Sequence, residues 1–153
     1  MAQWPVRVAV PADAAEVAGL LYDFNVEFDT PTPDREVLAD RLTRLLSRED
    51  ILVLLAGAPT VGVALLTLRP TPWSDGPFAL LEELYVVPER RDQGAGTALL
   101  LRAIDTCRER GAEEMQINVD EVDTDTRRFY ERHGFSNVDG VGGGLMFFYE
   151  REL

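Results

Sequence analysis

A basic, glycine-containing turn directly after a strand-like segment is the part of this sequence best suited to bind an anion. Residues 86–97 read Val-Val-Pro-Glu-Arg-Arg-Asp-Gln-Gly-Ala-Gly-Thr, so a proline ends the strand and a helix begins soon afterwards. Free N–H groups at a helix N-terminus, together with the helix dipole, attract phosphate oxygens. Gly94 and Gly96 have no side chain that would block an anion. Thr97 could cap the helix or add a hydroxyl donor, and Arg90 and Arg91 could pair with an outlying phosphate.

Two other phosphate-binding motifs do not fit this turn. A dinucleotide fingerprint needs a third glycine where Leu99 stands, and a P-loop needs Gly-Lys-Ser/Thr in a segment that contains no lysine. Short glycine motifs also occur in proteins without any ligand. If the turn is considered alone, the alternative is therefore a glycine-containing helix start that binds no anion.

The elements that must position this turn follow from the apolar pattern. Expected strands cover residues 6–10, 51–56, 61–68, 78–87, 115–119, 135–138 and 145–149. Expected helices cover residues 14–27, 34–48, 97–110 and 123–132. Helices alternate with strands only in part. We therefore expect an α/β (α+β) fold, one domain over residues 1–153, with a mixed twisted sheet of about six or seven strands and about four helices on both faces.

Two sequence blocks together resemble the GNAT family of acetyl-CoA-dependent N-acetyltransferases. Arg91-x-x-Gly94-x-Gly96 is similar to that family's Arg/Gln-x-x-Gly-x-Gly/Ala motif, and it follows a Val-x-Pro strand end as it does there. Residues 129–135, Phe-Tyr-Glu-Arg-His-Gly-Phe, resemble the family's Tyr-x-x-x-Gly-Phe segment. The matched part covers residues 80–135, and the flanking elements suit the same fold.

The resemblance implies that acetyl-CoA is the cosubstrate and that no metal is needed. The backbone around the turn would hold the CoA pyrophosphate, and the strands holding residues 84–87 and 115–119 would splay apart so that the pantetheine arm fits between them. A backbone N–H near Val86 or Val87 would hold the thioester carbonyl oxygen. The implied contacts are Val86, Val87, Arg91, Asp92, Gln93, Gly94, Ala95, Gly96 and Thr97. Asp123 stands where the family often has Asn, which weakens any transfer of a CoA contact to that helix start.

Three residues are candidates for proton transfer. By resemblance, Tyr130 is the general acid for the leaving thiolate; a packed aromatic is the alternative. An ammonium must lose a proton before its nitrogen attacks a thioester, so a base is needed too. Resemblance to polyamine-type members makes Glu82 the first choice and Glu83 the second, directly or through a water; ordinary surface carboxylates are the alternative. Adjacent residues of a regular strand face opposite sides, so only one of the two would line the cleft.

Composition and charge limit the partners. The net charge of −12 argues against nucleic acid and suits a cationic amine acceptor, although it could serve solubility alone. Asp23, Glu27 and Asp29 lie near the expected acceptor mouth. The sequence shows no signal peptide and no membrane span, and its single cysteine, Cys107, fits the core, so we expect a cytoplasmic protein. His133 reads as a surface imidazole at a helix end.

Three functions are consistent with these residues. The first is acetyl transfer to a small, cationic primary amine by direct attack in a ternary complex. The second is acetylation of a protein N-terminus or lysine, which would need a peptide groove. The third is a CoA-binding sensor without catalysis, which would lack an ionisable group facing the thioester. Homodimerisation is common in the family and is an expectation here.

Overall fold

Two apolar segments, β2 (Ile51–Ala56) and β3 (Gly62–Arg69), form the middle of a five-stranded sheet. The computed structural model describes residues 3–153, and its strand order is β1-β2-β3-β4-β5. The other strands are β1 (Val6–Val8), β4 (Phe78–Val86) and β5 (Met115–Ile117). Neighbours from β1 to β4 pair antiparallel. The nearly continuous burial of β2 indicates that both faces of the sheet are covered.

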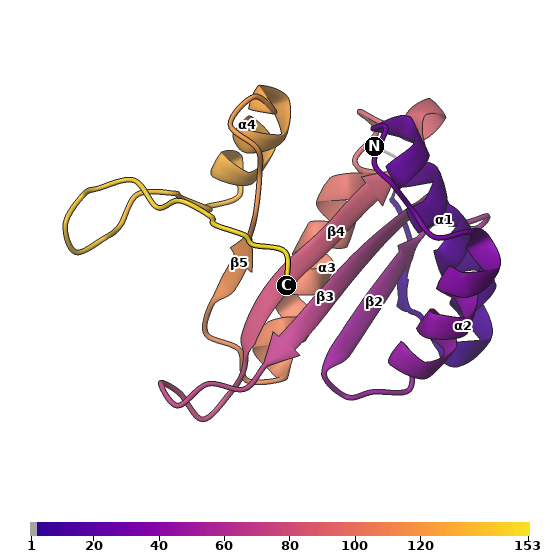
Figure 1. Cartoon of the computed structure of the whole chain (residues 1–153), viewed down its shortest axis with the longest axis horizontal. Helices are drawn as coiled ribbons and strands as arrows, with labels where there is room; N and C mark the ends of the chain where they lie inside the picture. Colours follow the sequence, from indigo (N-terminus) through magenta and orange to yellow (C-terminus); the bar gives the residue numbers. More distant parts are fainter. Residues whose placement is uncertain (1–2) are drawn as a thin grey trace. The chain divides into compact units, whose positions relative to one another are not determined.

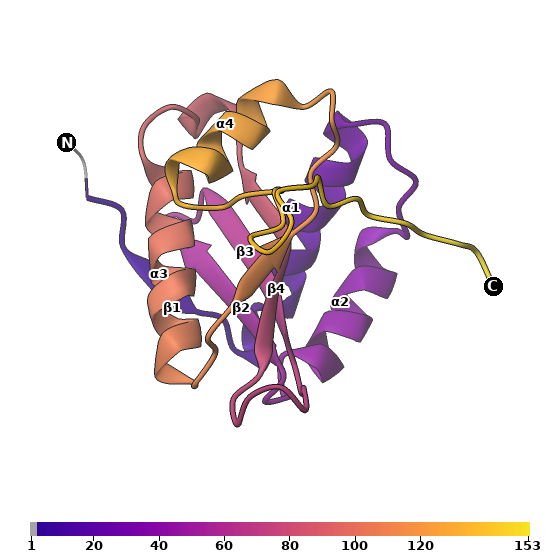
Figure 2. The same cartoon turned by 90° about the vertical axis from the view of Figure 1, so that its left-hand side faces the viewer.

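Helices cover the two faces of this sheet, as Figures 1 and 2 show. One face carries α1 (Ala14–Glu27) and α2 (Arg35–Leu45), and the other carries α3 (Ala95–Glu109). Side chains alternate between these layers. Val53, Val63 and Tyr85 join the core formed with α1 and α2. A Cβ on Gly62 would lie 3.1 Å from Leu99 of α3, on the opposite face. The expected α/β class with helices on both faces is confirmed.

Helix boundaries follow local capping. The sequence pattern places the second helix from residue 34, whereas Asp34 is its N-cap and accepts a hydrogen bond from the Val37 N–H at 2.9 Å. The 3₁₀ turns η1 (Pro11–Asp13) and η2 (Pro88–Arg90) precede α1 and the start of α3. Within residues 3–153, no helix combines the length and apolar character needed to cross a bilayer.

The chain divides into two compact units, Met1–Gln116 and Ile117–Leu153. In the second unit, α4 (Thr124–Arg132) is followed by residues expected to form two strands. They form only one isolated antiparallel bridge, between Val138 and Leu145. The expectation of about six or seven strands is therefore wrong, and the sheet has five.

Residues 135–138 and 145–149 do not form strands because no face of either segment is buried. A two-stranded hairpin on its own is at best marginally stable in water. Residues 145–149 are between 53% and 86% exposed, so no buried face fixes a register. The turn between them closes through its own backbone, with the Asp139 N–H donating to the Gly144 carbonyl at 2.7 Å. A single domain over residues 1–153 stays a prediction.

Candidate functional site

The turn between β4 and α3 leaves a run of backbone N–H groups without partners. Gly94 is the N-cap of α3, and the first bond inside the helix runs from the Ala98 N–H to the Gly94 carbonyl at 3.0 Å. Within the described part of the chain, the N–H groups of residues 92–97 donate to no acceptor. Such a run, ending at a helix N-terminus, suits an anion with several oxygens. The helix begins two residues before the expected position 97, which adds two helical amides to the run.

Backbone conformation, rather than crowding, explains the glycine at position 94. Gly94 has φ +90°, in the left-handed region that favours glycine. A Cβ there would meet only Trp4 Cδ1, at 4.0 Å, and would otherwise project into open space. Asp92 is also left-handed, with φ +58°.

Arg91 holds the turn to the body of the first unit. Its two terminal nitrogens each lie 2.7 Å from a carboxylate oxygen of Glu27, and its Nε donates to the Val86 carbonyl at 2.9 Å. Three of its five N–H donors are thus engaged. The Arg91 guanidinium lowers the pKa of the Glu27 carboxyl, and Glu27 in turn raises the pKa of Arg91. The Arg91 guanidinium, which was expected to pair with an outlying phosphate, therefore faces α1 instead.

Val86 and Val87 point their backbone groups in opposite directions. The Val87 N–H donates to the Val61 carbonyl at 2.9 Å, on the β3 side. Backbone groups alternate along an antiparallel ladder, so those of Val86 point away from β3. The binding of Arg91 Nε to the Val86 carbonyl agrees with this direction. Of the two amides expected to polarise a carbonyl, the one at Val87 is already paired.

The edge of β4 beside Val86 has no strand partner in the sheet described. β5 has three residues against nine in β4, and it ends at Ile117, two residues before the expected end. The Ala79 N–H donates to the Glu114 carbonyl at 3.0 Å, which places β5 beside the first half of β4. The second half of β4 thus offers an open edge to which an extended amide-bearing ligand could bind.

β4 carries a β-bulge at its two glutamates. Glu83 pairs with Leu65, whereas the next partner on β3, Leu66, lies opposite Leu81. Glu82 is therefore the extra residue of the bulge, with no partner on β3. Bulges interrupt the alternation of side chains between the two faces of a sheet.

The bulge brings both carboxylates to one face. Glu83 shares the face of its partner Leu65, which packs against the core under α1 and α2. Glu82 accepts a hydrogen bond from Thr67 Oγ1 at 2.5 Å, and Thr67 lies on the same face as Leu65, two residues away. The prediction that Glu82 and Glu83 face opposite sides is wrong, because it assumed a regular strand.

The two carboxylates differ in environment. Burial raises the pKa of Glu83, and the nearby charge of Glu82 raises it further. Glu82 is exposed, and its carboxylate is held by the Thr67 hydroxyl. A carboxyl whose pKa moves toward neutral pH is better matched to proton transfer than an ordinary surface glutamate. These features favour Glu83 over Glu82 as a proton acceptor.

In the second unit, Tyr130 lies on α4 and is 8% exposed. Its ring centroid is 5.1 Å from that of Phe129 and 5.5 Å from that of Phe135, both in edge-on contacts. His133 is half-buried, and its Nδ1 lies 2.8 Å from the Phe129 carbonyl. The general-acid role of Tyr130 stays a prediction.

Cys107 is 3% exposed, in the core as expected. Burial raises the pKa of its thiol, which disfavours a reactive thiolate. Among residues 3–153, no group of three or more His, Cys, Asp and Glu side chains is placed to hold a metal ion.

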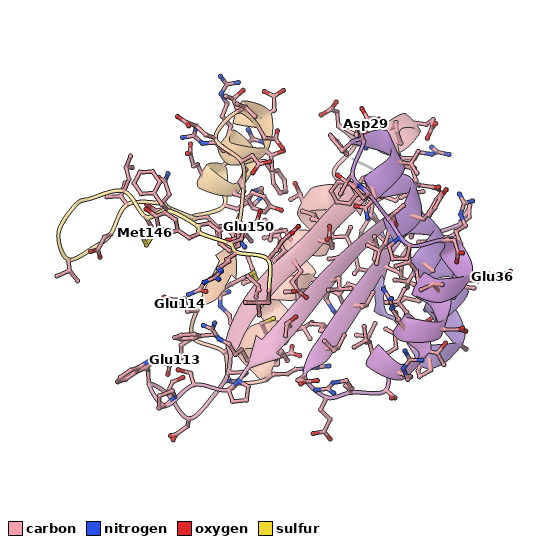
Figure 3. All side chains as sticks on the ribbon, viewed as in Figure 1. Asp29, Glu36, Glu113, Glu114, Met146 and Glu150 are labelled. Carbon is pink, nitrogen blue, oxygen red and sulfur yellow. The ribbon has the colours of Figure 1, made fainter. Side chains whose placement is uncertain are left out.

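Arginines neutralise two of the three acidic residues expected at the acceptor mouth. Asp23 lies 2.6 Å from Arg35, and Glu27 is paired with Arg91. Figure 3 shows Asp29, the third, after the end of α1, and no ion pair involves it within the described residues. The ion pair between Glu27 and Arg91 was not predicted from the sequence, because the two residues stand 64 positions apart. No local pattern could have revealed it.

The family and two of the proteins that this chain resembles are named as acetyltransferases. Residues 16–135 match the acetyltransferase (GNAT) family. The uncharacterized N-acetyltransferase YhfO of Bacillus subtilis (strain 168) is 28% identical over 137 residues, which is 88% of this chain and 91% of YhfO. A crystal structure from Arthrobacter sp. FB24, of a protein assigned as an acetyltransferase, is 52% identical with a TM-score of 0.92, covering 97% of this chain and 96% of that one.

A more distant structure shares the fold. An aminoglycoside acetyltransferase from an uncultured soil metagenomic sample, solved with trehalose and with sisomicin, gives TM-scores of 0.79 and 0.78 at 22% identity and covers 97% of each chain. The match to the family spans most of this chain, including the turn and the bulge. The chain therefore belongs to the acetyltransferase (GNAT) family, whose members are acyltransferases that use acetyl-CoA.

Proposed function

We propose that this acyltransferase moves the acetyl group of acetyl-CoA to the primary amine of a small cationic acceptor. The observation that carries the proposal is the run of unpaired N–H groups at residues 92–97, at the end of the strand that holds two carboxylates on one face. The turn suits the diphosphate of CoA, and Glu83 suits the proton transfer that an amine requires.

The turn and β4 would bind different parts of acetyl-CoA. The amides of Gln93 to Thr97 bind the diphosphate through backbone N–H groups. The open edge of β4 near Val86 accepts the amides of the pantetheine arm in a strand-like manner. The Val86 N–H, which points away from β3, is the donor we assign to the thioester carbonyl oxygen.

Proton transfers complete the chemistry. The carboxylate of Glu83, directly or through a water, takes a proton from the acceptor ammonium. The amine nitrogen then attacks the thioester carbonyl carbon, the C–S bond breaks, and the thiolate takes a proton from the Tyr130 hydroxyl. The newly acetylated nitrogen loses its second proton, which restores the Tyr130 hydroxyl, so the products are the neutral amide and the free thiol of CoA. Glu82 raises the proton affinity of Glu83 through its charge. We assign the base to Glu83, although the family resemblance places Glu82 first.

The acceptor class follows from charge. Glu82 and Glu83 on one face, within a chain of net charge −12, attract a cation to the strand where the chemistry would occur. Asp23 and Glu27 add little because arginines already pair with them. The aminoglycoside acetyltransferase with the same fold has been solved with sisomicin, which supports testing amines of this kind.

The test is a thiol-release assay with acetyl-CoA over polyamines, aminoglycosides, amino acids and peptides. We expect turnover with small polycationic amines and a much lower kcat/KM with peptides. Turnover confined to peptides would make the protein a peptide acetyltransferase. Calorimetric binding of CoA without turnover on any amine would instead indicate a sensor. A homodimer, the absence of nucleic-acid and membrane partners, and a cytoplasmic location stay predictions from the sequence.

A further inference from the structure

The turn that follows β4 contains two left-handed residues within three positions. Asp92 has φ +58° and Gly94 has φ +90°. Glycine adopts this conformation readily, but in a residue with a Cβ the left-handed conformation raises the free energy of the backbone. Such a residue persists where its surroundings hold it in place.

A side chain from the start of the chain holds the residue after Asp92. The indole Nε1 of Trp4 donates a hydrogen bond to the Gln93 carbonyl at 2.8 Å, across 89 positions. Its Cδ1 lies 4.0 Å from where a Gly94 Cβ would be, so the ring packs beside the N-cap of α3. Trp4 is itself fixed, because the Gly57 N–H donates to the carbonyl of the next residue, Pro5, at 2.8 Å.

A side chain from α1 holds the residue before Asp92. Glu27 makes the two-point ion pair with Arg91, and the Glu27 and Arg91 side chains are only 27% and 37% exposed. Two-point arginine–carboxylate pairs fix orientation more firmly than single contacts. Arg91 also lies over the Tyr85 ring, 5.6 Å from its centroid. The left-handed residue is thus held on both sides from distant parts of the first unit.

We propose that Trp4 and Glu27 are positioning residues that preorganise the turn for acetyl-CoA. They hold Gln93 and Arg91 so that the N–H groups of residues 92–97 are already exposed and aligned before the cosubstrate arrives. Binding then orders less backbone, which improves affinity. This inference rests on the proposed role of the turn in binding the CoA diphosphate. Neither residue takes part in the chemistry itself.

The experiment compares CoA with pantetheine, which lacks the diphosphate together with the 3′-phosphoadenosine attached to it, by calorimetry. Trp4→Phe keeps an aromatic ring but removes the N–H donor, and Glu27→Gln keeps the shape but removes the charge. Each should raise the Kd for CoA about 5- to 10-fold, as the loss of one ordering hydrogen bond implies. The Kd for pantetheine should stay unchanged. The KM for acetyl-CoA should rise with the Kd for CoA, while kcat stays within about twofold at saturating substrates.

Two matched variants control for the substitutions themselves. Trp73→Phe removes the other tryptophan, which is 83% exposed in the loop between β3 and β4. Asp50→Asn weakens another two-point pair, with Arg48, away from the turn. Both should leave CoA binding unchanged. Thermal melts of all variants test whether they are folded. Glu27→Ala removes both contacts to Arg91, so it should raise the Kd for CoA more than Glu27→Gln does.

The outcomes separate the inference from the proposed function. If Trp4→Phe and Glu27→Gln bind CoA as tightly as the wild type, and the wild type prefers CoA to pantetheine, the bracing role is wrong, while binding of the nucleotide diphosphate part of CoA is not contradicted. If the variants weaken CoA and pantetheine equally, their effect is general, and the bracing role is also wrong. If the wild type binds the two ligands equally, the turn holds no diphosphate, and both ideas fail.

Discussion

The turn at residues 92–97 and the bulge at Glu82 and Glu83 belong to the same strand–helix segment but supply different kinds of groups. The turn offers backbone N–H groups. These groups would stay in place whatever the side chains are, as long as the backbone keeps its conformation. The bulge offers two side chains whose shared direction depends on the register with β3. Cosubstrate binding and proton transfer therefore depend on separate groups of this segment. Changes in the turn should alter affinity for acetyl-CoA, and changes in the bulge should alter kcat and its pH dependence.

The largest effect should come from placing a charge in the turn. Gly96→Glu puts a carboxylate at the second amide of α3, where it would repel the diphosphate. Two like charges about 4 Å apart near a protein surface repel by about 4 kcal/mol, so KM for acetyl-CoA should rise on the order of 1000-fold. Steady-state kinetics measures this. Gly140→Glu, in open space in the second unit, is the control. An unchanged KM for Gly96→Glu would remove the diphosphate from this turn.

Removing the base should come next and should act on a different constant. Glu83→Gln keeps the shape but cannot accept the proton, so kcat should fall about 100-fold while KM for acetyl-CoA changes little. Because burial and Glu82 raise the pKa of Glu83, the acidic limb of the wild-type rate profile should lie above the range of an ordinary glutamate. Glu82→Gln should lower kcat less and shift that limb to lower pH. The opposite ranking would return the role of base to Glu82.

A smaller effect is expected from the predicted acid. Tyr130→Phe should lower kcat about 10-fold with no change in CoA affinity, because a thiolate is a good leaving group and needs only limited help. Tyr149→Phe, at a tyrosine that is 86% exposed, is the matched control. A rate equal to the wild type would leave Tyr130 as a packed aromatic between Phe129 and Phe135.

The smallest effect concerns stability and follows from the same raised pKa. The folded state favours protonated Glu83, so the ionised carboxylate destabilises the fold above its raised pKa. Below the ordinary glutamate pKa both folded and unfolded chains are protonated, and this contribution disappears. Glu83→Gln should therefore raise the Tm at about pH 8 and leave it unchanged at about pH 3.5. A lower Tm at the higher pH would mean that Glu83 stabilises the fold through a contact.

The sequence predicted the parts of this molecule that local pattern determines. The range of α1 was predicted in full, as was that of β2, because each has an apolar period and a clear end signal. The turn was placed correctly because glycine spacing and the preceding proline are local features. Gly94 is left-handed for the same local reason.

The rest depends on partners that the sequence does not reveal. The bulge at Glu82 is a mismatch with β3, so only the pairing of two strands exposes it. The bonds from Trp4 to Gln93 and from Glu27 to Arg91 join residues 89 and 64 positions apart. The strands expected at residues 135–138 and 145–149 have suitable residues, but no face is buried to hold them.

The most direct measurement is a crystal structure of the protein with CoA. We predict diphosphate oxygens within hydrogen-bond distance of the backbone nitrogens between Gln93 and Thr97, with the thiol end directed along β4 toward Glu83. A structure in which CoA is bound elsewhere, with those nitrogens still facing water, would contradict it.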